Sequence, residues 1–136
     1  MQTTGLHHIV MNVADLERSR HFYGDILGFE VRSLPADFPH PIFAGCLYFM
    51  VGTVEIFIVS HGQNQPGDRF SEFRIGLDHL SFPAPSEEAL QTFAEHLKAN
   101  GILTNGVETF LNRTPYVSFR DPDNIQLEYW LHKAEG

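Results

Sequence analysis

The most restrictive feature of this sequence is an internal repeat. Four residue types recur in the same order at a spacing of 71 or 73 residues: His8 and His79, Phe22 and Phe93, Gly28 and Gly101, and Glu55 and Glu128. An alignment of the two copies on these residues needs only one two-residue insertion. The chain of 136 residues is the length of one ordinary domain. The repeat therefore predicts a single domain, residues 1–136, built from two similar modules.

Each copy has the pattern of a strand, a helix and three further strands. In the first copy we expect strands at residues 6–13, 29–34, 46–51 and 53–60, with a helix that begins at Asp15 and ends at Gly28. In the second copy we expect strands at 77–82, 102–107, 116–119 and 125–131, with a helix from Ser86 to Gly101. The predicted class is α+β, with two βαβββ modules at about 5–60 and 77–132 and a polar linker at 61–76.

Histidine and glutamate occupy corresponding strands of the two copies. His8 and His79 lie on the first strand of each copy, and Glu55 and Glu128 lie on the last. If a pseudo-twofold duplication makes these strands central, the four side chains converge. Two imidazoles and one or two carboxylates form a common ligand set for Fe, Mn, Co, Ni or Zn. We therefore predict one divalent metal ion bound by His8, His79 and Glu128, with Glu55 as a further ligand.

Strand alternation shows which residues share a face with Glu55, and it leaves an alternative to metal binding. Glu55 shares a strand face with Phe57 and Val59, and a carboxylate in such a setting is costly to bury unless it is paired or ligated. Both glutamates could instead face solvent. His7 is expected to point to the opposite face from His8, so that only one of these neighbours is a ligand.

Composition excludes several classes of function. The net charge is -8, and the nine Lys and Arg residues form no basic cluster, so we expect no nucleic-acid partner. No apolar run reaches the roughly 18–20 residues of a membrane span. The first residues lack the pattern of a signal peptide, which favours a cytoplasmic protein. The one cysteine, Cys46, excludes an intrachain disulfide and is expected to be a buried, inert thiol.

Three segments resemble a known superfamily: residues 8–29 with Asp15-Leu16 and Phe22-Tyr23, residues 76–82 with Asp78-His79, and residues 119–128 with Asp121-Pro122-Asp123. They look like the vicinal oxygen chelate superfamily, which includes glyoxalase I, extradiol dioxygenases, fosfomycin-resistance proteins, methylmalonyl-CoA epimerase and bleomycin-resistance proteins. Asn124 stands where glycine is commoner, a change that the left-handed backbone tolerates. The resemblance implies an open, cupped mixed sheet around a metal ion, and a homodimer is our expectation.

The same resemblance implies the chemistry. The metal would stabilise an enolate-like or vicinal-oxygen intermediate of a small substrate as a Lewis acid. In a glyoxalase-type lyase or isomerase, one of Glu55 and Glu128 would be a ligand and the other a base.

Three alternatives to that activity stay open. An extradiol dioxygenase would use His8, His79 and Glu128, but residues 109–111 lack the histidine that such enzymes place upstream of the Asp121-Pro122 turn. A fosfomycin-type transferase would need a segment that is not recognisable in residues 108–116. A drug-binding resistance protein, which is not an enzyme, generally lacks the metal ligands.

Substrate specificity is expected to come from aromatic and cationic side chains near the ligands. A loop at residues 33–45, rich in proline and phenylalanine, could form a pocket wall or a rigid connection packed on the core. Trp130 lies two residues beyond Glu128 and so shares its strand face. The candidates for lining the substrate site are Phe43, Tyr48, Phe57, Tyr116, Arg120 and Trp130.

Overall fold

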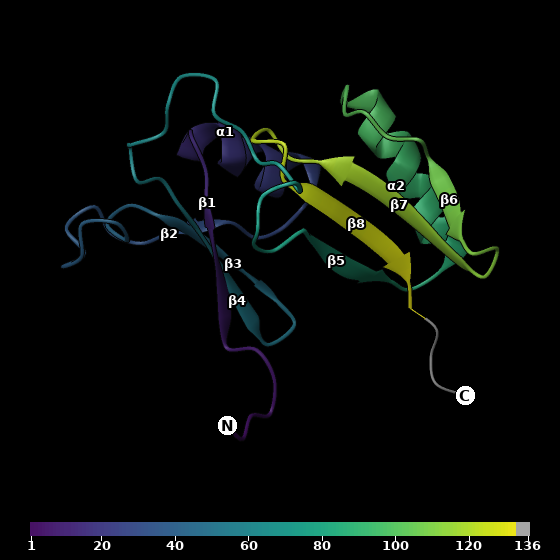
Figure 1. Cartoon of the computed structure of the whole chain (residues 1–136), viewed down its shortest axis with the longest axis horizontal. Helices are drawn as coiled ribbons and strands as arrows, with labels where there is room; N and C mark the ends of the chain where they lie inside the picture. Colours follow the sequence, from purple (N-terminus) through teal and green to yellow (C-terminus); the bar gives the residue numbers. More distant parts are fainter. Residues whose placement is uncertain (133–136) are drawn as a thin grey trace. The chain divides into compact units, whose positions relative to one another are not determined.

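The computed structural model describes residues 1–132, and the chain divides into two compact units, Met1–Asp68 and Arg69–Gly136 (Figure 1). Unit 1 contains β1 (His8–Asn12), α1 (Leu16–Arg20), the π-helix η1 (His21–Ile26), β2 (Arg32–Ser33), β3 (Leu47–Val51) and β4 (Val54–Val59). Unit 2 contains β5 (His79–Ala84), α2 (Glu87–Ala99), β6 (Val107–Phe110), β7 (Thr114–Arg120) and β8 (Gln126–Leu131). The predicted α+β class and the βαβββ order of each copy are confirmed.

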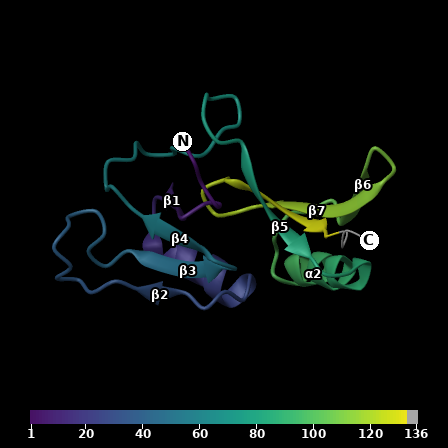
Figure 2. The same ribbon diagram turned by 90° about the horizontal axis from the view of Figure 1, so that it is seen from below.

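Each unit contains one open, mixed sheet of four strands (Figure 2). The strand order is β1-β4-β3-β2 in unit 1 and β5-β8-β7-β6 in unit 2. The first and last strands of each unit are parallel neighbours, and the remaining pairs are antiparallel. The strands that carry the predicted histidines therefore lie directly beside the strands that carry the predicted glutamates within each unit.

The sequence signals for the helix ends hold in both units. The Asp15 carboxylate accepts a hydrogen bond from the backbone N of Arg18 at 2.9 Å, and the Ser86 hydroxyl accepts one from Ala89 at 3.1 Å. Gly28 and Gly101 follow the helices with φ of 83° and 73°, a region that glycine enters without steric cost. The first helix differs from expectation because it continues after Arg20 as a π-helix.

The helices of each unit pack against one face of its sheet, and the opposite face, which carries His8 in unit 1 and His79 in unit 2, is here named the open face. In unit 1, Tyr23 of η1 stacks on Phe49 of β3 with ring centroids 5.6 Å apart, beside the buried Ile56 and Ile58 of β4. In unit 2, the Phe93 ring of α2 contacts the rings of Phe119 and Tyr129, each at 5.1 Å. Burial of this apolar surface is the main stabilising contribution to each unit.

Two further sequence predictions concern the one cysteine and the helices that could cross a membrane. Cys46 lies in the core of unit 1, as predicted, and burial raises the pKa of its thiol. Within residues 1–132, none of the helices combines the length and apolar character that a membrane crossing requires.

Two predicted strands differ from the structure. The strand expected at 102–107 begins only at Val107, because the chain turns at Gly106, whose φ is 78°. The Thr104 hydroxyl stabilises this turn: it accepts a hydrogen bond from Gly106 N and donates one to Ser118 O. The strand expected at 29–34 is reduced to Arg32–Ser33.

Candidate metal centre

His79 and Glu128 converge on the open face of the unit 2 sheet. His79 begins β5, and Glu128 lies on β8 beside Ser81. Alternation places Glu128 on the opposite face from Tyr129, whose ring packs on α2. The Nε2 atom of His79 lies 3.4 Å from Oε2 of Glu128. The structure thus brings together two of the predicted ligands.

The carboxylate of Glu128 is buried and held by two donors. Its exposure is 8%, so the charged group needs compensating contacts. Gln126 Nε2 donates to Oε1 at 3.2 Å, and the indole N–H of Trp130 donates to Oε2. Trp130 in turn stacks on Tyr116 with centroids 4.7 Å apart and an interplanar angle of 13°. These contacts fix the orientation of Glu128 on the open face.

His8 and Glu55 lie side by side in unit 1. They are register partners in the parallel pair of β1 and β4. Glu55 is half-buried, and among residues 1–132 no hydrogen bond holds its carboxylate. The His8 ring contacts the edge of Phe57 with centroids 6.0 Å apart. The structure thus brings the other two predicted ligands together as a second pair.

Three predicted substrate-lining residues gather beside this pair. The rings of Phe43 and Tyr48 lie 5.4 Å and 6.1 Å from the ring of Phe57, measured between centroids. Phe57 and Tyr48 share a sheet face with Glu55, because they alternate with the buried Ile56, Ile58 and Phe49. Unit 1 therefore presents a cluster of aromatic rings on the same face as His8 and Glu55.

The residue before each strand histidine contacts its ring. Nδ1 of His8 lies 2.8 Å from Nδ1 of His7, and Nδ1 of His79 lies 2.6 Å from Oδ1 of Asp78. The expectation that His7 points away from His8 is therefore wrong. The reason is that β1 begins at His8, so strand alternation does not govern the side chain of His7.

The strand register also corrects the alignment of the two copies. The register partner of His8 is Glu55, and the register partner of His79 is Gln126. Glu55 and Gln126 are 71 residues apart, as are His8 and His79. The counterpart of Glu128 in unit 1 is therefore Phe57, and the two glutamates do not occupy equivalent positions.

Arg120, a predicted substrate-lining residue, is engaged in a salt bridge. Its Nη1 and Nη2 atoms lie 3.2 Å and 3.0 Å from the two carboxylate oxygens of Glu72, and Nη1 also donates to Asn124 O at 3.1 Å. The hydrogen bond from Arg120 lowers the pKa of Glu72 to about 2. Arg120 thus ties residue 72 to the turn that precedes β8.

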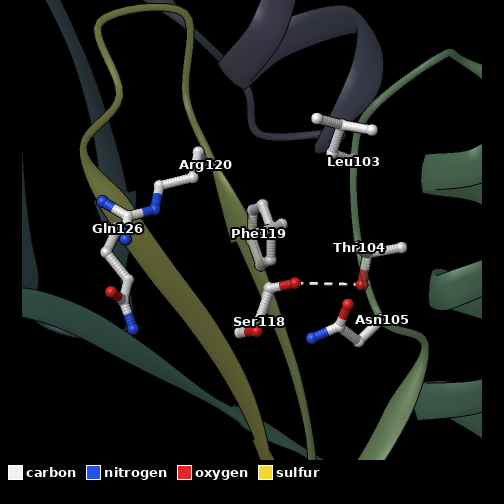
Figure 3. Close-up of a pocket in the computed structure, with 7 residues that line it drawn as sticks. All are labelled: Leu103, Thr104, Asn105, Ser118, Phe119, Arg120 and Gln126. Atoms are coloured by element: carbon white, nitrogen blue, oxygen red, sulfur yellow. Dashed lines mark hydrogen bonds between the residues drawn. The ribbon is translucent and has the colours of Figure 1, made fainter.

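A small cavity of about 180 Å³ opens beside Arg120 in unit 2 (Figure 3). The other polar residues that line this cavity were not among the sequence predictions. The strand pattern could have indicated two of them: Ser118 lies two positions before Arg120, Gln126 lies two positions before Glu128, and each alternates with buried neighbours. The dashed line in Figure 3 marks the 2.9 Å hydrogen bond from Thr104 to Ser118. The lining residues are Leu103, Thr104, Asn105, Ser118, Phe119, Arg120 and Gln126.

Neither unit alone supplies a full ligand set. Over the described part of the chain, residues 1–132, no group of three or more His, Cys, Asp or Glu side chains is placed to hold a metal ion. The arrangement that the structure shows is one histidine–glutamate pair in each unit.

A family model described as the Glyoxalase/Bleomycin resistance protein/Dioxygenase superfamily matches residues 5–129. The chain belongs to this superfamily. No curated protein sequence matches it. The match confirms the resemblance that the segments around His8, His79 and Glu128 indicated.

Solved structures of the superfamily share the fold over nearly the whole chain. A glyoxylase/bleomycin resistance protein/dioxygenase domain from Frankia sp. EAN1pec is 28% identical, with a TM-score of 0.80, and the match covers 97% of this chain and 100% of that one. A glyoxalase/dioxygenase from Nostoc punctiforme is 23% identical, with a TM-score of 0.77 and coverage of 96% and 92%. A lactoylglutathione lyase from Agrobacterium tumefaciens is 19% identical, with a TM-score of 0.71 and coverage of 100% and 99%. The last two likenesses concern the fold alone.

Proposed function

We propose that this superfamily member is a metal-dependent enzyme that binds one divalent ion through His8, His79 and Glu128, with Glu55 as a further ligand or as the base. The observation that supports this proposal is the pair of His79 and Glu128, whose Nε2 and Oε2 atoms are 3.4 Å apart. Two donors that each lie about 2.1 Å from a shared ion are about 3.0–3.4 Å apart in octahedral or tetrahedral geometry. The chemistry and spacing of this pair therefore fit a metal ion.

The proposed reaction is that of a lyase or isomerase acting on a small molecule. The metal would supply Lewis-acid stabilisation of negative charge on one or two neighbouring substrate oxygens. Glu128 is suited to the role of ligand, because Gln126 and Trp130 fix both of its oxygens. Glu55 is suited to the role of base, because its half-buried carboxylate lies beside His8.

Aromatic side chains near the two glutamates would form the surface that binds the substrate. Phe57, with Phe43 and Tyr48 against its ring, would exclude water from the substrate near Glu55. The stacked rings of Tyr116 and Trp130 would do the same near Glu128. A planar or apolar portion of the substrate is the chemistry that such surfaces accept.

A second candidate activity is that of an extradiol-type dioxygenase. The observation that favours it is the register, which places Phe57, and not a carboxylate, at the position equivalent to Glu128. His8, His79 and Glu128 would then form a ligand set of two histidines and one carboxylate, as in non-haem iron oxygenases. A drug-binding protein without a metal is the alternative of another class.

The test is metal binding by the purified chain after chelation and dialysis. We expect each chain to bind one ion of Co²⁺, Mn²⁺, Ni²⁺, Zn²⁺ or Fe²⁺ in titration calorimetry. His79→Ala should abolish binding, whereas His96→Ala, which removes an exposed histidine from α2 in the same unit, should leave it unchanged. Equal affinities of wild type and His79→Ala would contradict the proposal, and a chain without bound metal would favour the drug-binding alternative.

The cytoplasmic location and the homodimer stay predictions. Light scattering coupled to gel filtration tests the second of them, with about twice the 15.4 kDa mass of one chain as the expected result.

A further inference from the structure

The two strand histidines share an arrangement that the proposed ligand set does not explain. In each unit the side chain of the preceding residue reaches the Nδ1 atom of the histidine: His7 reaches His8 at 2.8 Å, and Asp78 reaches His79 at 2.6 Å. His7 and Asp78 are 71 residues apart, the same offset that relates the two histidines and the two helix caps Asp15 and Ser86. The contact is therefore a feature of the duplicated unit.

The position of these residues in the fold accounts for the contact. β1 begins at His8 and β5 begins at His79, so residues 7 and 78 lie just before the strands. A side chain at that point is not forced to the opposite face by strand alternation. It can turn to the open face and lie against the ring of the next residue.

The chemistry of Asp78 determines which nitrogen of His79 carries the proton. An ionised carboxylate can only accept hydrogen bonds, so Nδ1 of His79 must be the donor in this contact. In the neutral ring, Nε2 then carries a lone pair, and this lone pair faces Oε2 of Glu128 at 3.4 Å. In this tautomer Nε2 can share a cation with Oε2 of Glu128.

We propose that Asp78 is a positioning residue that holds His79 as the Nδ1–H tautomer and directs Nε2 to a metal ion shared with Glu128. The inference rests on the proposed metal centre. A carboxylate behind a ligand histidine fixes the ring and raises its basicity, and loss of such a partner typically lowers metal affinity by about 10–100-fold. His7 occupies the corresponding place behind His8, but a neutral imidazole lacks the charge of Asp78. His79 is therefore the stronger of the two histidine ligands.

Two measurements on the full chain test this inference. The first is ¹⁵N–¹H NMR of the histidine rings in the metal-free protein at mildly alkaline pH, which reports the tautomer of His79 without any metal. The second is the dissociation constant for Co²⁺, measured by calorimetry on wild type, Asp78→Ala and Asp78→Asn. The matched control is Asp25→Ala, because Asp25 makes a similar contact of 2.8 Å to Nδ1 of His21 on the exposed surface of η1.

We expect wild-type His79 to be the Nδ1–H tautomer, and Asp78→Ala to lose this preference. Co²⁺ affinity should fall about 10–100-fold in Asp78→Ala and by less in Asp78→Asn, whose amide oxygen still accepts from Nδ1. Asp25→Ala should bind Co²⁺ like wild type, and the thermal midpoints of the metal-free variants should stay close to that of wild type because Asp78 is exposed.

The possible failures can be told apart. If wild type binds Co²⁺ and Asp78→Ala binds it equally well, or if His79 is the Nε2–H tautomer in the metal-free protein, the role of Asp78 is overturned and the metal centre stands. If wild type binds no metal ion at all, the metal centre itself is overturned, and with it the role of Asp78.

Discussion

Glu55 lies directly beside His8, as its register partner across the parallel strands β1 and β4. The corresponding partner of His79 in unit 2 is Gln126, and Glu128 lies two residues further along β8. The side chain of Phe57 therefore stands where Glu128 stands in the other unit. Because the two glutamates occupy different positions, we expect them to contribute differently to the proposed centre.

The first prediction compares the two carboxylates. Glu128→Gln should lower metal affinity strongly, because the buried and doubly hydrogen-bonded carboxylate of Glu128 is the ligand beside His79. Glu55→Gln should lower it less and should lower turnover more, as removal of a base does. Calorimetry of metal binding and steady-state kinetics separate these effects. If Glu55→Gln leaves both quantities unchanged, the isomerase proposal loses its support and the three-ligand, dioxygenase-like site gains it.

The second prediction concerns the indole that holds Glu128. Trp130→Phe keeps an aromatic ring against Tyr116 but removes the N–H that donates to Oε2 of Glu128. A buried charged group that loses a hydrogen-bond donor typically costs about 1–3 kcal/mol. We expect a loss of this size in the free energy of unfolding in urea. The control Tyr116→Phe keeps the stacked ring and should change the free energy by less than about 0.5 kcal/mol. A change equally small in Trp130→Phe would show that the indole N–H does not stabilise the buried carboxylate.

The third prediction concerns the turn before β8. Asp121 is buried, and its Oδ1 atom accepts hydrogen bonds from the backbone N of Asp123 at 2.9 Å and of Ile125 at 2.8 Å. Asp121→Ala should lower the free energy of unfolding by about 1–3 kcal/mol, because it leaves these backbone groups without their acceptor. Asn124 has φ of 69°, which glycine also adopts, so Asn124→Gly should cost less than Asp121→Ala and lose only the 2.9 Å hydrogen bond from Asn124 Nδ2 to Phe70 O. Denaturation curves in which Asn124→Gly is the more damaging change would contradict this account of the turn.

The fourth prediction is a dependence of stability on pH through Glu72. The folded pKa of Glu72 is about 2, below its ordinary value of 4.5, because Arg120 donates to the carboxylate. A depressed pKa means that the carboxylate stabilises the fold above pH 4.5 and that this contribution is lost as the pH falls toward 2.

The variant Glu72→Gln tests the pH prediction. It should be less stable than wild type near neutral pH, and the difference should shrink between pH 4.5 and pH 2. Salt should reduce the difference as well, because the pair is only partly buried. A difference in thermal midpoint that stays constant with pH would show that Glu72 acts through packing and not through its charge. The surface pair of Arg32 and Glu30 offers a control, since Glu30→Gln should have a smaller effect.

The corrections to the sequence predictions have a common cause. The expected equivalence of Glu55 and Glu128 rested on matching identical residues, whereas the register is set by how a strand pairs with a neighbour far away in sequence. The pairing of Arg120 with Glu72, which the sequence predictions did not include, joins residues 48 positions apart. The strand expected at 102–107 failed because Gly106 turns the chain before pairing begins.

The sequence by itself determined the repeated βαβββ order, the capped helix starts at Asp15 and Ser86, and the strands on which His8, His79 and Glu128 lie. These features depend on neighbours within a few residues, where periodicity and capping chemistry act. Only the tertiary structure decided that Gln126 and Trp130 hold Glu128, that Asp78 reaches His79, and that Glu55 lies level with His8. Those relationships depend on strand register and on side-chain direction at strand ends, which a local pattern does not specify.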